Sequence, residues 1–80
     1  MHELRCDPTI ATVWDSLPAA ASEQLTKAIA DVCADPIGTT EPYGIDDGTM
    51  RQLVLDDTIV VLLVTETLKL VRILQINHLG

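Results

Sequence analysis

Four side chains in the second half of the sequence could together bind a phosphate group and move a proton: Arg51, Lys69, Arg72 and His78. Cleavage of a phosphodiester by a 2′-hydroxyl needs a base near that hydroxyl, cations on the phosphate and an acid for the leaving oxygen. Arginine can bind phosphate through two parallel hydrogen bonds, and histidine exchanges protons near neutral pH. Arg51 and Arg72 are therefore candidate phosphate ligands, and His78 is the candidate group for proton transfer.

Each of these candidates also has a purely structural interpretation. Arg72 and His78 are six residues apart and would share one face of a straight strand, whereas Lys69 would face the other way. The face of Arg72 would also carry Leu70, Leu74 and Ile76. Arg72 could thus be a partly buried arginine that pairs with a carboxylate, and the same alternative stands for Arg51. His78, near the end of the sequence, could simply be a frayed polar residue.

Other kinds of site find little support in the sequence. Cys6 and Cys33 have no neighbouring Cys or His at ligand spacing, so we interpret both as reduced packing residues. The pairs Asp46-Asp47 and Asp56-Asp57 lack the spacing of a calcium loop and suit turns. The sequence has no glycine-rich phosphate loop. We therefore expect no cofactor and no metal.

The first half of the chain is predicted to contain a short strand and two helices. Residues 2–6 alternate loosely, as an edge strand does. Asp7-Pro8 is a typical helix start, with Asp as N-cap and Pro at the first helical position. That helix ends before Pro18, and a second one is predicted over 19–34, stopped by Asp35-Pro36. With almost no loop between them, the two helices form a hairpin.

The second half is predicted to be a loop followed by three strands. The loop covers 37–49, and the strands cover 50–55, 58–65 and 68–77. The resulting α+β fold has the order β-α-α-β-β-β: a four-stranded, largely antiparallel sheet with the helical hairpin on one face. The middle strand does not alternate, so both of its faces should be covered. We expect the core to contain Trp14, Leu17, Leu25, Ile29, Val32, Leu53, Val61, Leu63 and Ile73.

Composition predicts a single domain, residues 1–80, that has a partner. The 80 residues carry a net charge of −7, which disfavours broad binding to nucleic acids or anionic membranes. The mean hydropathy is +0.28, high for so small an interior, and indicates apolar surface that another chain covers. The longest apolar run, Ile59 to Val64, is far shorter than the roughly 20 residues of a membrane span. Without a visible signal peptide, we expect a cytoplasmic protein.

The order of elements and several local motifs resemble the RelE/ParE toxin superfamily of bacterial type II toxin–antitoxin modules. The motifs are Trp14-Asp15-Ser16-Leu17-Pro18 between the helices, Asp35-Pro36, Met50-Arg51-Gln52-Leu53 and the closing Val71 to His78. RelE-like members cleave messenger RNA on the ribosome, whereas ParE-like members poison DNA gyrase. The resemblance covers nearly the whole chain, and its C-terminal ending looks more like the ParE side.

The resemblance implies an antitoxin partner whose C-terminal segment wraps the helices and the sheet. It leaves the target, gyrase or ribosome-bound messenger RNA, open. The chain departs from the nuclease members because its middle strand carries no arginine, its sequence stops at Gly80 without their basic tail, and it is acidic. We therefore expect weak or absent ribonuclease activity. The alternative is an inactive superfamily member that acts as a small protein-binding module or as a homodimer.

Overall fold

The computed structural model describes residues 1–44 and 49–79 and has the predicted α+β order of elements. They are β1 (Glu3–Arg5), α1 (Pro8–Asp15), α2 (Ala19–Ala34), β2 (Glu41–Pro42), β3 (Met50–Val54), β4 (Thr58–Thr65) and β5 (Leu70–His78). The strand β2 lies in the segment that was predicted to be loop. The Asp46-Asp47 pair of that segment lies outside the described residues.

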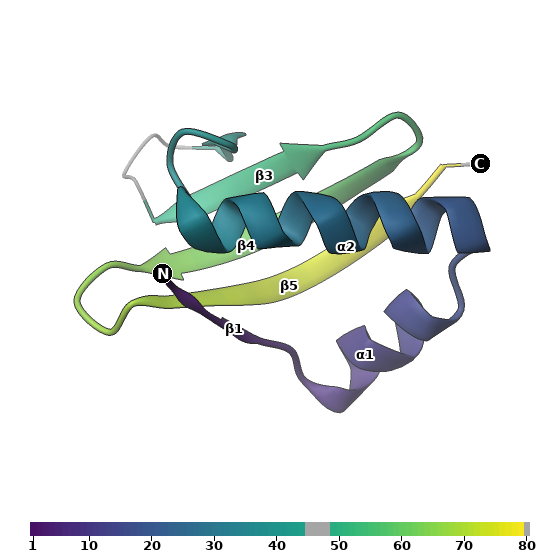
Figure 1. The fold of residues 1–80 in the computed structure, drawn as a ribbon, viewed down its shortest axis with the longest axis horizontal. Coiled ribbons are helices and arrows are strands. Elements are labelled where there is room, and N and C mark those ends of the chain that lie inside the picture. The colour runs from purple at the N-terminus through teal and green to yellow at the C-terminus, as the bar shows by residue number, and fades with distance from the viewer. Residues whose placement is uncertain (45–48, 80) are drawn as a thin grey trace.

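The strands form one sheet in the order β1-β5-β4-β3-β2, with α2 lying across one face (Figure 1). The three long strands form the predicted antiparallel meander. The described sheet has five strands rather than the expected four, because β2 adds a two-residue edge beside β3. At the other edge β1 runs parallel to β5, since the helical hairpin carries the chain across the sheet before the meander begins.

Local chemistry sets the start of α1 and the end of α2. The side chain of Asp7 caps α1 by accepting a hydrogen bond from the backbone N–H of Ile10 at 2.9 Å, with Pro8 as the first helical residue. The helix α2 spans 19–34 as predicted and stops at Asp35, because Pro36 follows.

The core lies between the helices and the sheet, and α1 contributes Ile10 to it. It contains Leu25, Ile29, Val32 and Cys33 from α2, Leu53 from β3, Val60, Leu62 and Val64 from β4, and Val71, Ile73 and Ile76 from β5. Trp14 and Leu17, which were expected in the core, are only partly buried and pack against its margin.

The middle strand faces the helices with the opposite parity from the one predicted. Val60, Leu62 and Val64 point toward α2, whereas the predicted core residues Val61 and Leu63 lie on the other face. Val61 is nevertheless buried and Leu63 is half-buried. An uninterrupted apolar run contains no alternation, so the sequence could not show which parity faces the helices. We call the face without helices the open face of the sheet.

Candidate functional site

Arg51 is an interior residue in the described structure. It is 5% exposed, on the helix side of β3. Its guanidinium donates from Nε to Thr40 Oγ1 at 2.9 Å and from Nη2 to the carbonyls of Thr40 and Ile37 at 2.7 and 3.2 Å. Thr40 in turn donates to the Pro36 carbonyl. Arg51 therefore holds the segment that leaves α2, and its donors point into the fold.

A β-bulge in β5 separates the other two candidates. Ile73 pairs with Leu62 and Gln75 pairs with Val61, so Leu74 is an extra residue in the ladder. The extra residue changes the parity, and Val71, Ile73 and Ile76 all reach the core. Arg72 consequently lies on the open face, whereas His78, which follows the bulge, lies on the helix side. The expectation that these two side chains share a face is wrong, because it assumed a straight strand.

His78 lies in a small polar cluster at the start of β4, beside Thr58. Its Nδ1 is 3.2 Å from Oγ1 of the fully buried Thr58 and 4.0 Å from Oδ1 of Asp57. The Thr58 hydroxyl also lies 3.4 Å from that carboxylate oxygen. With a proton on Nδ1, the imidazole donates to Thr58, the hydroxyl donates to Asp57, and Nε2 keeps its lone pair. This arrangement can orient the ring, and a proton acceptor would then be available at Nε2.

The predicted residues therefore do not converge on one site. Along β4, Arg51 is opposite Leu62 and Arg72 is opposite Leu63, but on different faces of the sheet. His78 is opposite Thr58, four residues further from Leu62, or about 13 Å at the rise of a strand. Lys69 lies in the turn before β5, with a positive φ of 53°. No reacting group could touch all three candidates at once.

The structure instead brings Arg72 together with Arg5. In the parallel β1–β5 ladder these two arginines are register partners, so both side chains lie on the open face. Together with Cys6 and Asp7 they line a shallow cavity of about 300 Å³. Arg5 was missed because nothing in the local sequence indicates that β1 pairs with β5 in this register. The order of elements gives no signal for this pairing either, because the two helices connect β1 to β2 and β3 and not to β5.

Negative charge lies close to this cavity. Glu3 Oε1 is 3.3 Å from the Arg5 guanidinium, and both side chains are more than half exposed, so the pair contributes little stability. Partial desolvation raises the pKa of the Cys6 thiol, and the Asp7 carboxylate raises it further. Cys6 is exposed and Cys33 is buried, and both are free thiols.

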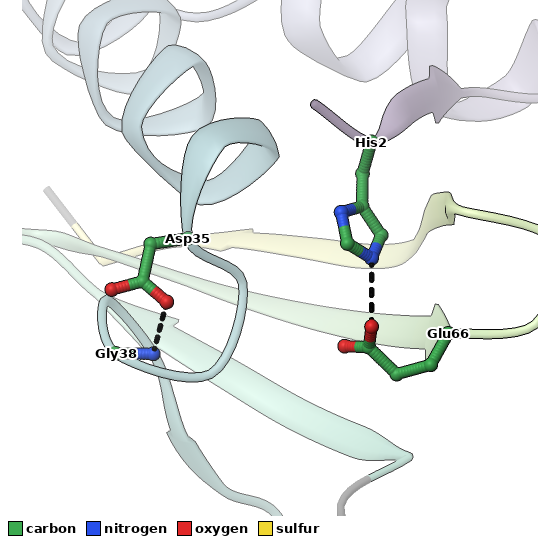
Figure 2. A network of polar contacts seen from close by, with 4 residues as sticks. All are labelled: His2, Asp35, Gly38 and Glu66. Atoms are coloured by element: carbon green, nitrogen blue, oxygen red, sulfur yellow. Dashed lines mark hydrogen bonds and ion pairs between the residues drawn. The ribbon is translucent and has the colours of Figure 1, made fainter.

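Two further polar contacts lie near the N-terminus and in the turn after α2 (Figure 2). His2 Nε2 lies 3.2 Å from Glu66 Oε2 and connects the N-terminus to the β4–β5 turn. The Asp35 carboxylate accepts from the Gly38 N–H at 3.1 Å. A Cβ at Gly38 would overlap Asp35 Oδ2, so this turn leaves no room for a side chain unless the carboxylate moves.

Neither a metal cluster nor a membrane helix is visible in the described ranges. Among residues 1–44 and 49–79, no three His, Cys, Asp or Glu side chains gather in a way that could hold a metal ion. In the same ranges no helix is long and apolar enough to cross a membrane.

Solved structures match the chain over nearly its whole length. The isolated RelE toxin of E. coli matches with a TM-score of 0.83 at 20% identity, over 100% of this chain and 86% of that one. A chain of the intact E. coli RelBE toxin–antitoxin complex matches at 0.82 and 20%, over 100% and 99%. The RelBE2 complex of Mycobacterium tuberculosis matches at 0.81 and 15%, over 96% of both. No family model and no curated protein matches the sequence.

The chain therefore has the fold of the RelE toxins, as the resemblance in its sequence predicted. Its element order, its sheet and its helical layer are those of that fold class.

Proposed function

We propose that this protein is the toxin component of a type II toxin–antitoxin module and that a partner antitoxin neutralises it. One observation carries the proposal: 96–100% of the chain superposes on the RelE toxin and on chains of two RelBE toxin–antitoxin complexes. The proposal keeps the expectation of a cytoplasmic protein, where both gyrase and the ribosome are found.

The open face of the sheet is the surface that this antitoxin would cover. Its residues are Met50, Gln52 and Val54 of β3, Ile59, Val61, Leu63 and Thr65 of β4, and Leu70, Arg72, Gln75 and Asn77 of β5. Most of the larger side chains among them are aliphatic, and no described element lies over them. An amphipathic segment with lysines or arginines at its polar positions would suit this face, because the chain carries a charge of −7. A second copy of the chain is the alternative cover.

The distribution of the candidate catalytic residues favours weak or absent ribonuclease activity. Arg51 is engaged in the interior, and Arg72 and His78 lie on different faces of β5. Loss of one positioned catalytic group commonly costs about 10²–10⁴-fold in rate. The same observation favours the second candidate function, an inactive relative that only binds a protein partner. Inhibition of gyrase needs a binding surface but no set of catalytic residues. Gyrase therefore remains a candidate target, as does ribosome-bound messenger RNA.

Induction of the protein in a bacterial host tests the proposal. We expect growth arrest that disappears when the product of the adjacent gene is co-expressed. Messenger RNA ends and gyrase–DNA breaks are mapped in the arrested cells to identify the target. Regularly spaced RNA cuts that vanish in Arg72→Ala would overturn the expectation of weak cleavage.

Two other results of the same experiment would distinguish an inactive binding protein from a protein outside any toxin–antitoxin module. Tight binding of the neighbouring gene product without growth arrest would assign the inactive protein-binding module. The absence of both arrest and binding would refute the toxin–antitoxin proposal.

A further inference from the structure

The β1–β5 edge of the open face holds two adjacent arginines that share a single carboxylate contact, from Glu3 to Arg5. Arg5 and Arg72 are direct register partners in adjacent strands, which lie about 4.8 Å apart. Like charges directly opposite each other in a sheet are destabilising. Arg5 contacts Glu3, but in the described part of the chain the Arg72 side chain makes no hydrogen bond or ion pair. A bound anion would relieve this repulsion.

From this arrangement the geometry points to a binding site for one phosphate group between Arg5 and Arg72. The two guanidinium groups border the same cavity of about 300 Å³, and each can bind phosphate oxygens through two parallel N–H donors. Both side chains are exposed, so a ligand reaches them without any rearrangement of the fold.

The carboxylates near the cavity limit the ligand to one phosphate. Asp7 lines the cavity, but its Oδ1 already accepts the N–H of Ile10 at the start of α1. The Glu3 carboxylate contacts one nitrogen of the Arg5 guanidinium, and the other N–H donors of that group can still bind a ligand. The chain as a whole carries −7 and repels an extended polyanion. The ligand is thus a single phosphate, either free or belonging to a short single-stranded RNA segment that crosses the sheet edge.

This site does not depend on the proposed function. A protein that arrests no growth could still bind phosphate here, and a toxin that acts only by contact with its target could lack the site. The growth assay and the binding assay therefore fail or succeed separately.

The binding test uses the full chain and two probes, inorganic phosphate and a labelled oligonucleotide of six uridines. The chain has three arginines, so the arginine Nε–Hε signals in NMR report each position. We expect the signals of Arg5 and Arg72 to shift on titration, while the signal of the buried Arg51 stays fixed. Bound ligand should also slow the alkylation of Cys6, with buried Cys33 as the internal reference.

Variants then distinguish binding at the Arg5–Arg72 site from a general effect of the protein's net charge. Arg72→Ala and Arg5→Ala should each weaken binding by about tenfold or more, because each removes a charge-assisted bidentate contact. Lys27→Ala removes the same charge from an exposed position on α2 and should change affinity less than about twofold. Asp7→Asn keeps the helix cap and removes a nearby negative charge, so it should tighten binding.

The outcomes decide both the site and the source of the phosphate. If the oligonucleotide binds about tenfold more tightly than inorganic phosphate, and its affinity falls with salt, the site takes a nucleic-acid phosphate. If the two probes bind equally, it takes free phosphate. Fixed Arg5 and Arg72 signals, or equal losses in Arg72→Ala and Lys27→Ala, would overturn the site.

Discussion

An arginine whose guanidinium is buried behaves differently from one on the surface, and this chain has both kinds. Arg51 satisfies one hydroxyl and two carbonyls in the interior, whereas Arg72 lies exposed on the open face. Sequence spacing alone grouped these two residues as phosphate ligands. In the structure, one holds the chain after α2 and the other is available to a ligand.

Replacement of Arg51 should therefore damage the fold. In Arg51→Met the aliphatic stem is retained, but Thr40 and the Ile37 carbonyl lose their donors. We expect the free energy of unfolding to fall by about 2–3 kcal/mol, because buried acceptors are left unsatisfied. Urea denaturation measures the loss.

The matched control is Arg72→Met, an exposed position where we expect a change within about 0.5 kcal/mol. Equal unfolding midpoints for the two variants would show that Arg51 does not anchor the segment after α2.

At the scale of elements, the bulge in β5 decides which residues share a face. Leu74 is the residue without a partner in the β4 ladder, and it is 40% exposed. Because of this one residue, Ile73 and Ile76 both reach the core although they are three apart in the sequence. A straight strand would direct them to opposite faces.

Deletions in β5 test this account. Removal of Leu74 leaves Ile73 opposite Leu62 and Ile76 opposite Val60, so every core contact of the strand is retained. Removal of Ile76 instead shifts the last residues by one and puts polar Gln75 or Asn77 at a buried position. We expect the first variant to fold cooperatively and the second to lose about 2–5 kcal/mol or fail to fold.

Thermal denaturation followed by circular dichroism compares the two deletions. Greater damage from removal of Leu74 than from removal of Ile76 would contradict the account that Leu74 is an extra residue without a core contact.

The described residues, 1–44 and 49–79, form a two-layer fold in which the helices cover one side of the sheet (Figure 1). Two adjacent leucines of β4 lie on opposite faces of the sheet. Leu62 is fully buried against α2, and Leu63 is half-buried on the open face. The stability of the chain should depend on the first side chain, and its association with a partner should depend on the second.

The same substitution at both positions separates these roles. Leu62→Ala should cost about 3–4 kcal/mol, since it leaves a cavity in the core, and small domains have only about 5–15 kcal/mol in total. Leu63→Ala should cost about 1 kcal/mol or less in the free chain. It should weaken the complex with the partner protein, or self-association, by about tenfold.

Chemical denaturation and calorimetric titration with the partner give the two numbers. A Leu63→Ala variant that binds its partner as tightly as the parent chain would contradict the assignment of the open face as the covered surface.

Local chemistry in the sequence determined both helices and the meander. Asp7-Pro8, Pro18 and Asp35-Pro36 fix the helix boundaries through capping and the restrictions around proline. Short polar turns fix the strands that follow them. These interactions join residues only a few positions apart, so they can be predicted without knowledge of the rest of the fold.

Only the tertiary structure decided where the functional side chains lie. The parity of β4, the bulge at Leu74, the burial of Arg51 and the register that places Arg5 beside Arg72 all depend on pairings between distant segments. Side chains alternate between faces every residue along a strand, so one extra residue reverses the outcome. For this reason the sequence grouped Arg72 with Arg51, whereas the β1–β5 register places it beside Arg5.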